Sequence, residues 1–150
     1  PGPTILADAK ADWFAFFGDL SALPAISVNL QRLPDDALGF AFLEVPSEDD
    51  CLDLEKPAGI QVEWIVNKNP EVYSDELFQR LEKLAWMDGA PYIWVAGEFE
   101  LMRSARKKLK PLKSEVQGTY VSSYWKIGAT QEGLQKAKAL EEVKSRLRMG

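Results

Sequence analysis

Histidine is absent from this sequence. It is the commonest metal ligand in proteins and the commonest general base near neutral pH. Its absence excludes Ser-His-Asp and Cys-His nucleophilic catalysis, and it excludes the usual zinc sites. Hydride or electron transfer on a bound cofactor needs no acid or base from the protein, so this class of chemistry is compatible with the composition.

Cysteines and long apolar runs are also scarce. Cys51 is the single cysteine, which excludes an internal disulfide framework and fits a reducing cytoplasm. No apolar run approaches the roughly 20 residues of a membrane span, and the N-terminus shows no signal-peptide pattern. The net charge of −5 argues against nucleic acid as the main partner.

The composition predicts one globular domain. Of the 150 residues, 46% are hydrophobic and 27% are charged, which suffices for a sizeable core. Residues 1–11 begin with Pro1, Gly2 and Pro3, a start that predicts either a linker to something longer or simple fraying. We expect residues 12–128 to form the domain and residues 129–150 to form a C-terminal helix.

The opening stretch of the domain predicts a strand, a turn and a helix start. Residues 13–17 (WFAFF) form a continuous apolar run, which is typical of a strand buried on both faces of a parallel sheet. Gly18 and Asp19 mark the turn, Ser21 is the predicted helix cap, and Pro24 is tolerated in the first helical turn. Such a turn presents backbone N–H groups to a phosphate; the alternative is an ordinary connection that binds nothing.

The rest of the chain repeats this alternation. Further strands are predicted over residues 39–45, 60–66, 92–98 and 119–125, and helices over residues 24–33, 74–85 (capped by Ser74), 100–109 and from Thr130 onward. The pattern predicts an α/β fold with an open five-stranded parallel sheet, helices on both faces and a C-terminal helix. Ligands of such sheets bind at the carboxyl ends of the strands, at the switch point.

Polar and aromatic residues at the strand ends predict a nucleotide cleft. They are Gly18, Asp19, Leu20, Ser21, Glu44, Asn67, Lys68, Gly97, Glu98, Tyr124, Trp125 and Lys126. The G-x-G-x-x-G fingerprint is missing, since Gly18 is the only glycine of the first loop, and this argues against a standard Rossmann dehydrogenase.

Some of these residues have alternative interpretations. Glu44 lies where dinucleotide folds often hold the adenosine ribose with a carboxylate, although a solvated edge charge is the preferred interpretation. Lys68 could meet a phosphate, but an exposed loop lysine is the default explanation. Strand alternation predicts that Tyr124 and Trp125 face opposite sides of the sheet, and one of them could stack on a ring.

The predicted helix over residues 100–109 carries a basic face. Its cations are Arg103, Arg106, Lys107 and Lys108, followed by Lys110 and Lys113. A solvated face is the preferred interpretation, and contact with an anionic partner or substrate is the alternative. The C-terminal helix has an apolar stripe, so it either docks on the domain or packs on a partner. A non-catalytic protein-interaction domain is therefore an alternative function.

Three motifs lie in order at predicted strand ends. They are residues 18–26 (GDLSALPAI), 94–98 (WVAGE) and 123–128 (SYWKIG), the last followed by a helix. Together they resemble the siderophore-interacting proteins, which are flavin-dependent ferric-siderophore reductases. The resemblance covers essentially the whole chain.

The resemblance implies a two-domain enzyme of which this chain is the second part. In that family an FAD-binding β-barrel precedes an NAD(P)H-binding α/β domain of the ferredoxin-reductase type, so residues 1–11 resemble the junction. The implied reaction passes a hydride from NAD(P)H to FAD and then single electrons to a ferric siderophore, which releases Fe(II). The choice between NADH and NADPH stays open, since Lys68 favours a phosphate and Glu44 opposes one. Replacement of the nicotinamide cofactor by a ferredoxin also stays open.

The resemblance also implies roles for single residues. The loop facing the pyrophosphate and nicotinamide would consist of Gly18, Asp19, Ser21, Ala22, Leu23 and Pro24. The adenosine ribose or its 2′-phosphate would meet Asn67 and Lys68, and the nicotinamide would be flanked by Ala96, Gly97 and Glu98. Tyr124 and Trp125 would lie near the flavin ring. The anionic ferric siderophore would meet Lys126, and the basic helix adds Arg103 and Arg106 as candidate contacts.

Overall fold

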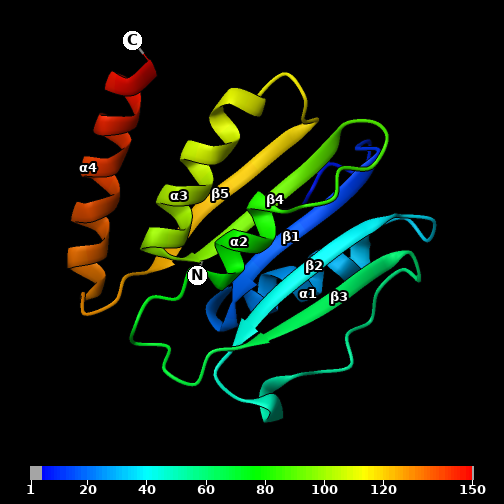
Figure 1. Ribbon diagram of the computed structural model, residues 1–150, viewed down its shortest axis with the longest axis horizontal. Coiled ribbons are helices and arrows are strands. Elements are labelled where there is room, and N and C mark those ends of the chain that lie inside the picture. The colour runs from blue at the N-terminus through cyan, green and yellow to red at the C-terminus, as the bar shows by residue number, and fades with distance from the viewer. Residues whose placement is uncertain (1–4, 150) are drawn as a thin grey trace.

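Five parallel strands form the central sheet of the structure, a computed structural model that describes residues 5–149. The strands are β1 (Trp13–Asp19), β2 (Gly39–Val45), β3 (Ile60–Val66), β4 (Pro91–Glu98) and β5 (Gly118–Trp125). Their order is β3-β2-β1-β4-β5 (Figure 1). The predicted parallel α/β sheet is therefore confirmed; Pro1, Gly2 and Pro3 of the predicted linker lie outside the described residues.

Helices cover both faces of this sheet. One face carries α1 (Leu23–Arg32), and the other carries α2 (Glu76–Glu82) and α3 (Phe99–Leu109), as Figure 1 shows. The C-terminal helix α4 (Gln131–Met149) lies beside α3. Only the short 3-10 turn η2 (Glu48–Asp50) interrupts the coil between β2 and β3, so the alternation of strands and helices breaks at this connection.

The central strand β1 organises the core. All seven of its residues are buried. Because successive side chains of a strand point to opposite faces, Trp13 and Phe17 pack beneath α2 and α3, whereas Phe14 and Phe16 pack against α1. Burial of each of these side chains contributes about 2 kcal/mol of hydrophobic free energy. Because both faces of β1 are covered, none of residues 13–17 faces solvent, which explains the unbroken apolar run over these residues.

The switch point of the sheet lies between β1 and β4. From β1 the chain adds β2 and β3 on one side, and it then crosses back to add β4 and β5 on the other. The helices that follow β1 and β4 consequently leave toward opposite faces, α1 to one and α3 to the other. This divergence leaves the carboxyl ends of the central strands accessible to a ligand.

The segment before β1 is fastened to the domain by hydrogen bonds. The Ile5 carbonyl accepts from the Trp94 indole at 3.0 Å and from the Asn29 side chain at 3.1 Å, and the Ala7 N–H donates to Asn29 at 2.8 Å. Asn29 is 2% exposed, so its amide is a buried polar group with its partners present. Residues 5–7 of the predicted junction are therefore held against α1 and β4.

The helix caps differ in part from the prediction. Ser21 does not cap α1: the N-cap is Ala22, which offers no side-chain acceptor, and the preceding 3-10 turn η1 (Leu20–Ala22) is capped by Asp19. The prediction for Ser21 was wrong because the chain makes this extra turn before the α-helix begins. Ser74 is not the N-cap of α2 either: the N-cap is Asp75, although Ser74 Oγ accepts the Glu76 N–H at 3.3 Å. The helix α2 ends at Glu82, three residues earlier than predicted.

Candidate functional site

A cleft of about 310 Å³ lies at the carboxyl edge of the sheet. The ends of β1, β2, β3 and β5 and the loops after them line it with Asp19, Leu20, Ser21, Glu44, Val45, Pro46, Asn67, Pro70 and Trp125. A smaller hollow of about 20 Å³ shares five of these residues and adds Glu98 and Ile127. The volume of the main cleft is in the range of small-molecule and cofactor sites.

The Asp19 carboxylate holds the ends of three strands together. Its Oδ2 accepts the Glu98 N–H of β4 at 2.9 Å and the Trp125 indole N–H of β5 at 2.8 Å. Its Oδ1 accepts the N–H and the hydroxyl of Ser21, the middle residue of the turn η1 after β1. Asp19 is 8% exposed, and a buried carboxylate is stable only when donors surround it. Both carboxylate oxygens of Asp19 are therefore occupied by hydrogen bonds that hold the strand ends around the cleft in place.

Two glycines make this close approach of strands possible. Gly97 has a φ of 155°, and a Cβ added there would lie 2.6 Å from Asp19 Oδ2. At Gly18 an added Cβ would lie 2.6 Å from Ile26 Cδ1 and 2.8 Å from Ala22 Cβ. Gly18 therefore lets the start of α1 pack directly on β1, and Gly97 lets β4 pass beside the Asp19 carboxylate.

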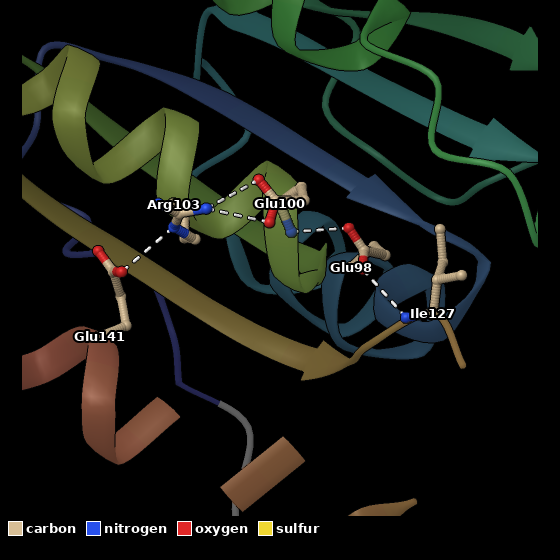
Figure 2. A network of polar contacts seen from close by, with 5 residues as sticks. All are labelled: Glu98, Glu100, Arg103, Ile127 and Glu141. Atoms are coloured by element: carbon tan, nitrogen blue, oxygen red, sulfur yellow. Dashed lines mark hydrogen bonds and ion pairs between the residues drawn. The ribbon is translucent and has the colours of Figure 1, made fainter. Parts of the chain in front are cut away.

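A second buried carboxylate, Glu98, joins the end of β5 to α3. Glu98 Oε1 accepts the Glu100 N–H at 2.7 Å, which caps α3, and Oε2 accepts the Ile127 N–H at 3.1 Å (Figure 2). The Glu100 carboxylate accepts from Arg103, whose Nε also donates to Glu141 of α4 at 3.2 Å. Figure 2 shows that this chain of polar contacts runs from the end of β5 to α4.

The carboxyl group of Glu44 differs from these two because it has few donors. Oε1 accepts one long hydrogen bond of 3.5 Å from Asn67 Nδ2, and Oε2 is buried with no hydrogen-bond partner among the described residues. Burial raises the pKa of Glu44 from 4.5 to about 7, and the negative charges of Asp19 and Glu76 add to this rise. The preferred interpretation of Glu44 as a solvated edge charge was therefore wrong.

The structure brings only part of the expected cofactor-binding set into the main cleft. Of that set, four residues line it: Asp19, Ser21, Asn67 and Trp125. The residues that lie elsewhere are Gly18, Ala22, Leu23 and Ala96, which are buried in strand and helix packing, Pro24 and Lys68, which are exposed, and Gly97, which packs on Asp19. Glu98 lines the smaller hollow.

Tyr124 and Trp125 separate as strand alternation predicts. The Tyr124 ring packs edge-on against Trp94 on the α1 face of the sheet, and its hydroxyl lies 3.1 Å from the Tyr120 hydroxyl. Burial raises the pKa of Tyr124, and the Tyr120 neighbour adds to the effect. Trp125 instead reaches Asp19 at the cleft. Of these two aromatic residues, only Trp125 is therefore in a position to contact a ligand in the main cleft.

The basic residues predicted to contact the siderophore lie at two different sites on the surface. Lys126 Nζ lies 4.7 Å from the centre of the Phe99 ring, and with Arg103 it lines a hollow of about 230 Å³ between α3 and α4. The hydrogen bond from Arg103 to Glu100 raises the pKa of Arg103. Arg106 lies outside this hollow, where its Nη2 donates to the Val121 carbonyl at 3.5 Å. Arg106 is half-buried and lines a separate hollow of about 680 Å³ with Lys110 and Lys113. The interpretation of this helix face as solvated therefore holds best for Lys107 and Lys108, which are exposed.

Sequence reasoning missed the apolar wall of the cleft. Val45 and Pro46 follow Glu44 directly, and Pro70 closes the loop after β3. Each of the two prolines presents apolar surface beside a polar group of the cleft. A signal was available, because an apolar residue and a proline at a strand end in a parallel sheet lie where ligands bind.

Residues 5–149 offer neither a cluster of metal ligands nor a helix that could span a membrane. No group of three or more cysteine, aspartate or glutamate side chains in this part of the chain is arranged to hold a metal ion. None of the described helices is both long and apolar enough to span a bilayer.

Comparison with known proteins gives consistent matches. The ferric vibriobactin reductase ViuB of Vibrio cholerae is 36% identical over 87% of this chain and 49% of its own. The solved structure of the siderophore-interacting protein SipS from Aeromonas hydrophila has a TM-score of 0.75 and 31% identity, and the match covers 93% of this chain and 54% of that one. A siderophore utilization protein from T. fusca has a TM-score of 0.72 and 30% identity, with 81% and 47% covered.

These matches also define the extent of the likeness. The chain spans about half the length of the curated relatives that it matches. The sequence model of the siderophore-interacting proteins matches residues 11–128, which include the whole sheet and the cleft at its edge. The chain belongs to the siderophore-interacting protein family.

Proposed function

We propose that this chain is the NAD(P)H-binding module of a flavin-dependent ferric-siderophore reductase. The observation that carries the proposal is the cleft at the switch point, which combines an apolar wall with a few polar groups. Open parallel sheets bind nucleotides at this place. The likeness to a protein described as a ferric vibriobactin reductase supports the reaction class.

The residues present fit a dinucleotide. Pro46 and Pro70 offer apolar surface of the kind that an adenine ring packs on, whereas Val45 is 1% exposed. Glu44 and Asn67 offer hydrogen-bonding groups beside the two prolines. Trp125 lies at the other end of the strand order, on β5, where we expect the nicotinamide half. The turn over residues 18–24 supplies the start of α1, whose positive dipole end suits the pyrophosphate.

Several of the expected contacts act by positioning. The Asp19 oxygens are taken by protein donors, and so are those of Glu98. We therefore assign these two carboxylates to holding Trp125 and the backbone around Gly97 in place, close to the nicotinamide. Lys68 is exposed and lies outside the cleft lining; its proposed contact with the ribose or its phosphate needs a movement of the loop after β3.

The flavin is assigned to a domain outside this chain. In the complete reductase NAD(P)H supplies a hydride to FAD, and electrons then pass to Fe(III) of the siderophore, the substrate. Lys126 is the proposed contact for the anionic ferric siderophore, because its ammonium lies on the Phe99 ring at the start of α3. We propose a cytoplasmic enzyme, in which a ferredoxin is the alternative electron donor.

The interaction-domain alternative has less support from the structure. It depends on a free basic face on α3, but Arg103 is bound to Glu100 and Glu141 within the chain. Leu134 and Ala137 of α4 pack on the domain, which accounts for part of the apolar stripe. The described contacts therefore favour docking of α4 over an exposed partner surface at its first turns.

An NMR titration with NADH tests the proposal on the chain itself. Each of the five tryptophans gives an indole resonance, and we expect the Trp125 resonance to shift on addition of NADH. Trp86 is the matched control, because it is 43% exposed and packs on Trp13; its resonance is expected to stay unchanged. A Trp125→Phe variant assigns the signal and is expected to weaken binding. Identical spectra with and without millimolar nucleotide would refute the proposed function.

A second experiment tests the flavin assignment. The gene sequence immediately upstream of Pro1 is expected to encode a β-barrel. The joined protein is expected to be yellow and to oxidise NAD(P)H when a ferric chelate is added. A colourless joined protein, or an upstream region without such a barrel, would contradict the assignment.

A further inference from the structure

We infer that Glu44 makes this cleft select NADH over NADPH, by accepting the hydroxyl groups of the adenosine ribose and by repelling a 2′-phosphate. The inference rests on the proposed function, since it concerns the same cleft. It identifies Glu44 as a residue that determines cofactor specificity, and it chooses between NADH and NADPH. Three features of Glu44 support it: its position, the hydrogen bonds of its carboxyl group, and the charges of the residues around it.

Glu44 lies at the rim of the main cleft. Glu44 is the penultimate residue of β2, and its backbone partners are Asp19 of β1 and Ile65 of β3. Val45 and Pro46 follow it on the same rim of the cleft. An adenine ring packed on Pro46 places its attached ribose next to the Glu44 carboxyl group. A carboxylate near the second strand end is where parallel dinucleotide folds hold the ribose hydroxyls.

The second feature is hydrogen bonding. Asp19 and Glu98 have donors on both carboxylate oxygens, whereas Glu44 has one bond of 3.5 Å to Asn67, and its Oε2 has no partner in the described structure. A buried acceptor without a donor costs free energy, about 1–3 kcal/mol. A ribose diol carries two O–H donors and can supply the missing bonds. Glu44 is therefore the one of these three carboxyl groups that has an unfilled acceptor, and its buried Oε2 meets a ribose hydroxyl when the side chain turns toward the cleft.

The third feature is charge. The residues that line the main cleft include two carboxylates, Asp19 and Glu44, and no lysine or arginine. The adjoining hollow adds Glu98 and again no cation. Lys68, which directly follows the cleft residue Asn67 in the sequence, is exposed and lies outside both linings. A 2′-phosphate beside Glu44 would meet like charge without a compensating cation, and such contacts are strongly unfavourable.

Titrations with NADH and NADPH test the inference. They are run on the full chain at about pH 8, because burial raises the pKa of Glu44 to about 7 and the carboxylate is ionised above it. We expect NADH to bind at least about tenfold more tightly than NADPH, a factor that corresponds to ~1.4 kcal/mol. In Glu44→Gln the ratio is expected to fall to about threefold or less, because the amide cannot repel the phosphate.

The control variant is Asp49→Asn. It removes one negative charge from the exposed loop that follows β2, outside the cleft lining, and we expect it to keep the wild-type ratio. ADP-ribose and its 2′-phosphate derivative serve as fragment probes, because they report on the adenosine half without the nicotinamide.

The outcomes separate the two proposals. Equal affinity of the wild-type chain for NADH and NADPH, or tighter binding of NADPH, would overturn the role of Glu44 and leave the nucleotide-binding function standing. An unchanged ratio in a folded Glu44→Gln variant would do the same. Absence of binding by both nucleotides and both fragments would overturn the function together with the inference. Because the wild-type comparison needs no substitution, the test holds even if the variant fails to fold.

Discussion

Replacing Asp19 with alanine removes the acceptor of four hydrogen bonds. Two of them join the end of β1 to β4 and β5, and the other two come from Ser21 in the turn after β1. The Glu98 N–H is buried, and an unpaired buried donor costs about 1–3 kcal/mol. The Ser21 N–H and the Trp125 indole are partly buried, so each one adds about 0.5–1 kcal/mol. Release of the buried carboxylate recovers some of its desolvation cost. We expect Asp19→Ala to lower the free energy of unfolding by about 3 kcal/mol.

A conservative variant sharpens this prediction. In Asp19→Asn the amide oxygen can still accept from Glu98 and Trp125, while the amide NH₂ turns toward the Ser21 hydroxyl, which can accept from it. Only the bond from the Ser21 N–H is lost. The expected loss is about 1 kcal/mol, a third of that in the alanine variant.

Urea unfolding followed by tryptophan fluorescence measures these differences. With a slope of about 2 kcal/mol per molar urea, the midpoint of Asp19→Ala is expected to fall by about 1.5 M. Asp36→Ala is the control, since Asp36 is exposed, and its stability is expected within about 0.5 kcal/mol of wild type. The reasoning is refuted if Asp19→Ala matches that control, or if the asparagine and alanine variants lose the same amount.

Three further predictions follow from the cleft and its surroundings. Gly97→Ala is expected to lower the free energy of unfolding by about 2 kcal/mol or more in urea, because the φ of 155° and the Asp19 oxygen 2.6 Å from an added Cβ exclude a side chain. The control is Gly133→Ala in α4, where an added Cβ has ordinary contacts of 3.4 Å or more, and this variant is expected to gain up to about 1 kcal/mol. Equal losses of stability in the two variants would contradict this reasoning. Folding raises the pKa of Glu44 from 4.5 to about 7, so the contribution of Glu44 to stability is complete below pH 4.5 and is lost as the pH rises through 7. Relative to wild type, the Glu44→Gln variant is therefore expected to gain about 1 kcal/mol of stability between pH 4.5 and pH 7, after allowance for solvent screening. A stability difference between variant and wild type that stays constant over this pH range would refute the prediction. Arg103→Met is expected to speed hydrogen exchange in α4 severalfold because it breaks the ion pair between α3 and α4, whereas Arg106→Met is not; equal exchange in both variants would show that the pair does not hold α4.

The sheet could be predicted closely because its signal is local. The strand predicted over residues 60–66 is observed with the same bounds, and the strand predicted over residues 92–98 begins one residue earlier, at Pro91. Apolar runs that end at glycine, proline or polar residues fix such bounds through backbone preferences alone. The caps were less predictable. Ser21 and Asp19 are both good capping residues, and only the additional 3-10 turn decides between them.

The cleft could be located from the sequence, but the roles of its residues could not be assigned. Asp19, Asn67 and Trp125 line it as expected from their places at strand ends. The partners of Asp19 lie far away in the sequence, on β4 and β5, so no local pattern shows that its carboxylate is already saturated. For Glu44 the reverse holds. Its lack of donors follows from what packs around it, and composition carries no information about a missing partner.

The hydrogen bonds of Asp19 also bear on how this chain folds. They join residues 79 and 106 positions apart in the sequence. Contacts of such long range form only after the entropy of closing large loops has been overcome, so they form late in folding. The rim of the cleft is therefore completed together with the last strands of the sheet. We expect a partly folded chain to have no affinity for a nucleotide, so in destabilised variants binding should decline in proportion to the native fraction.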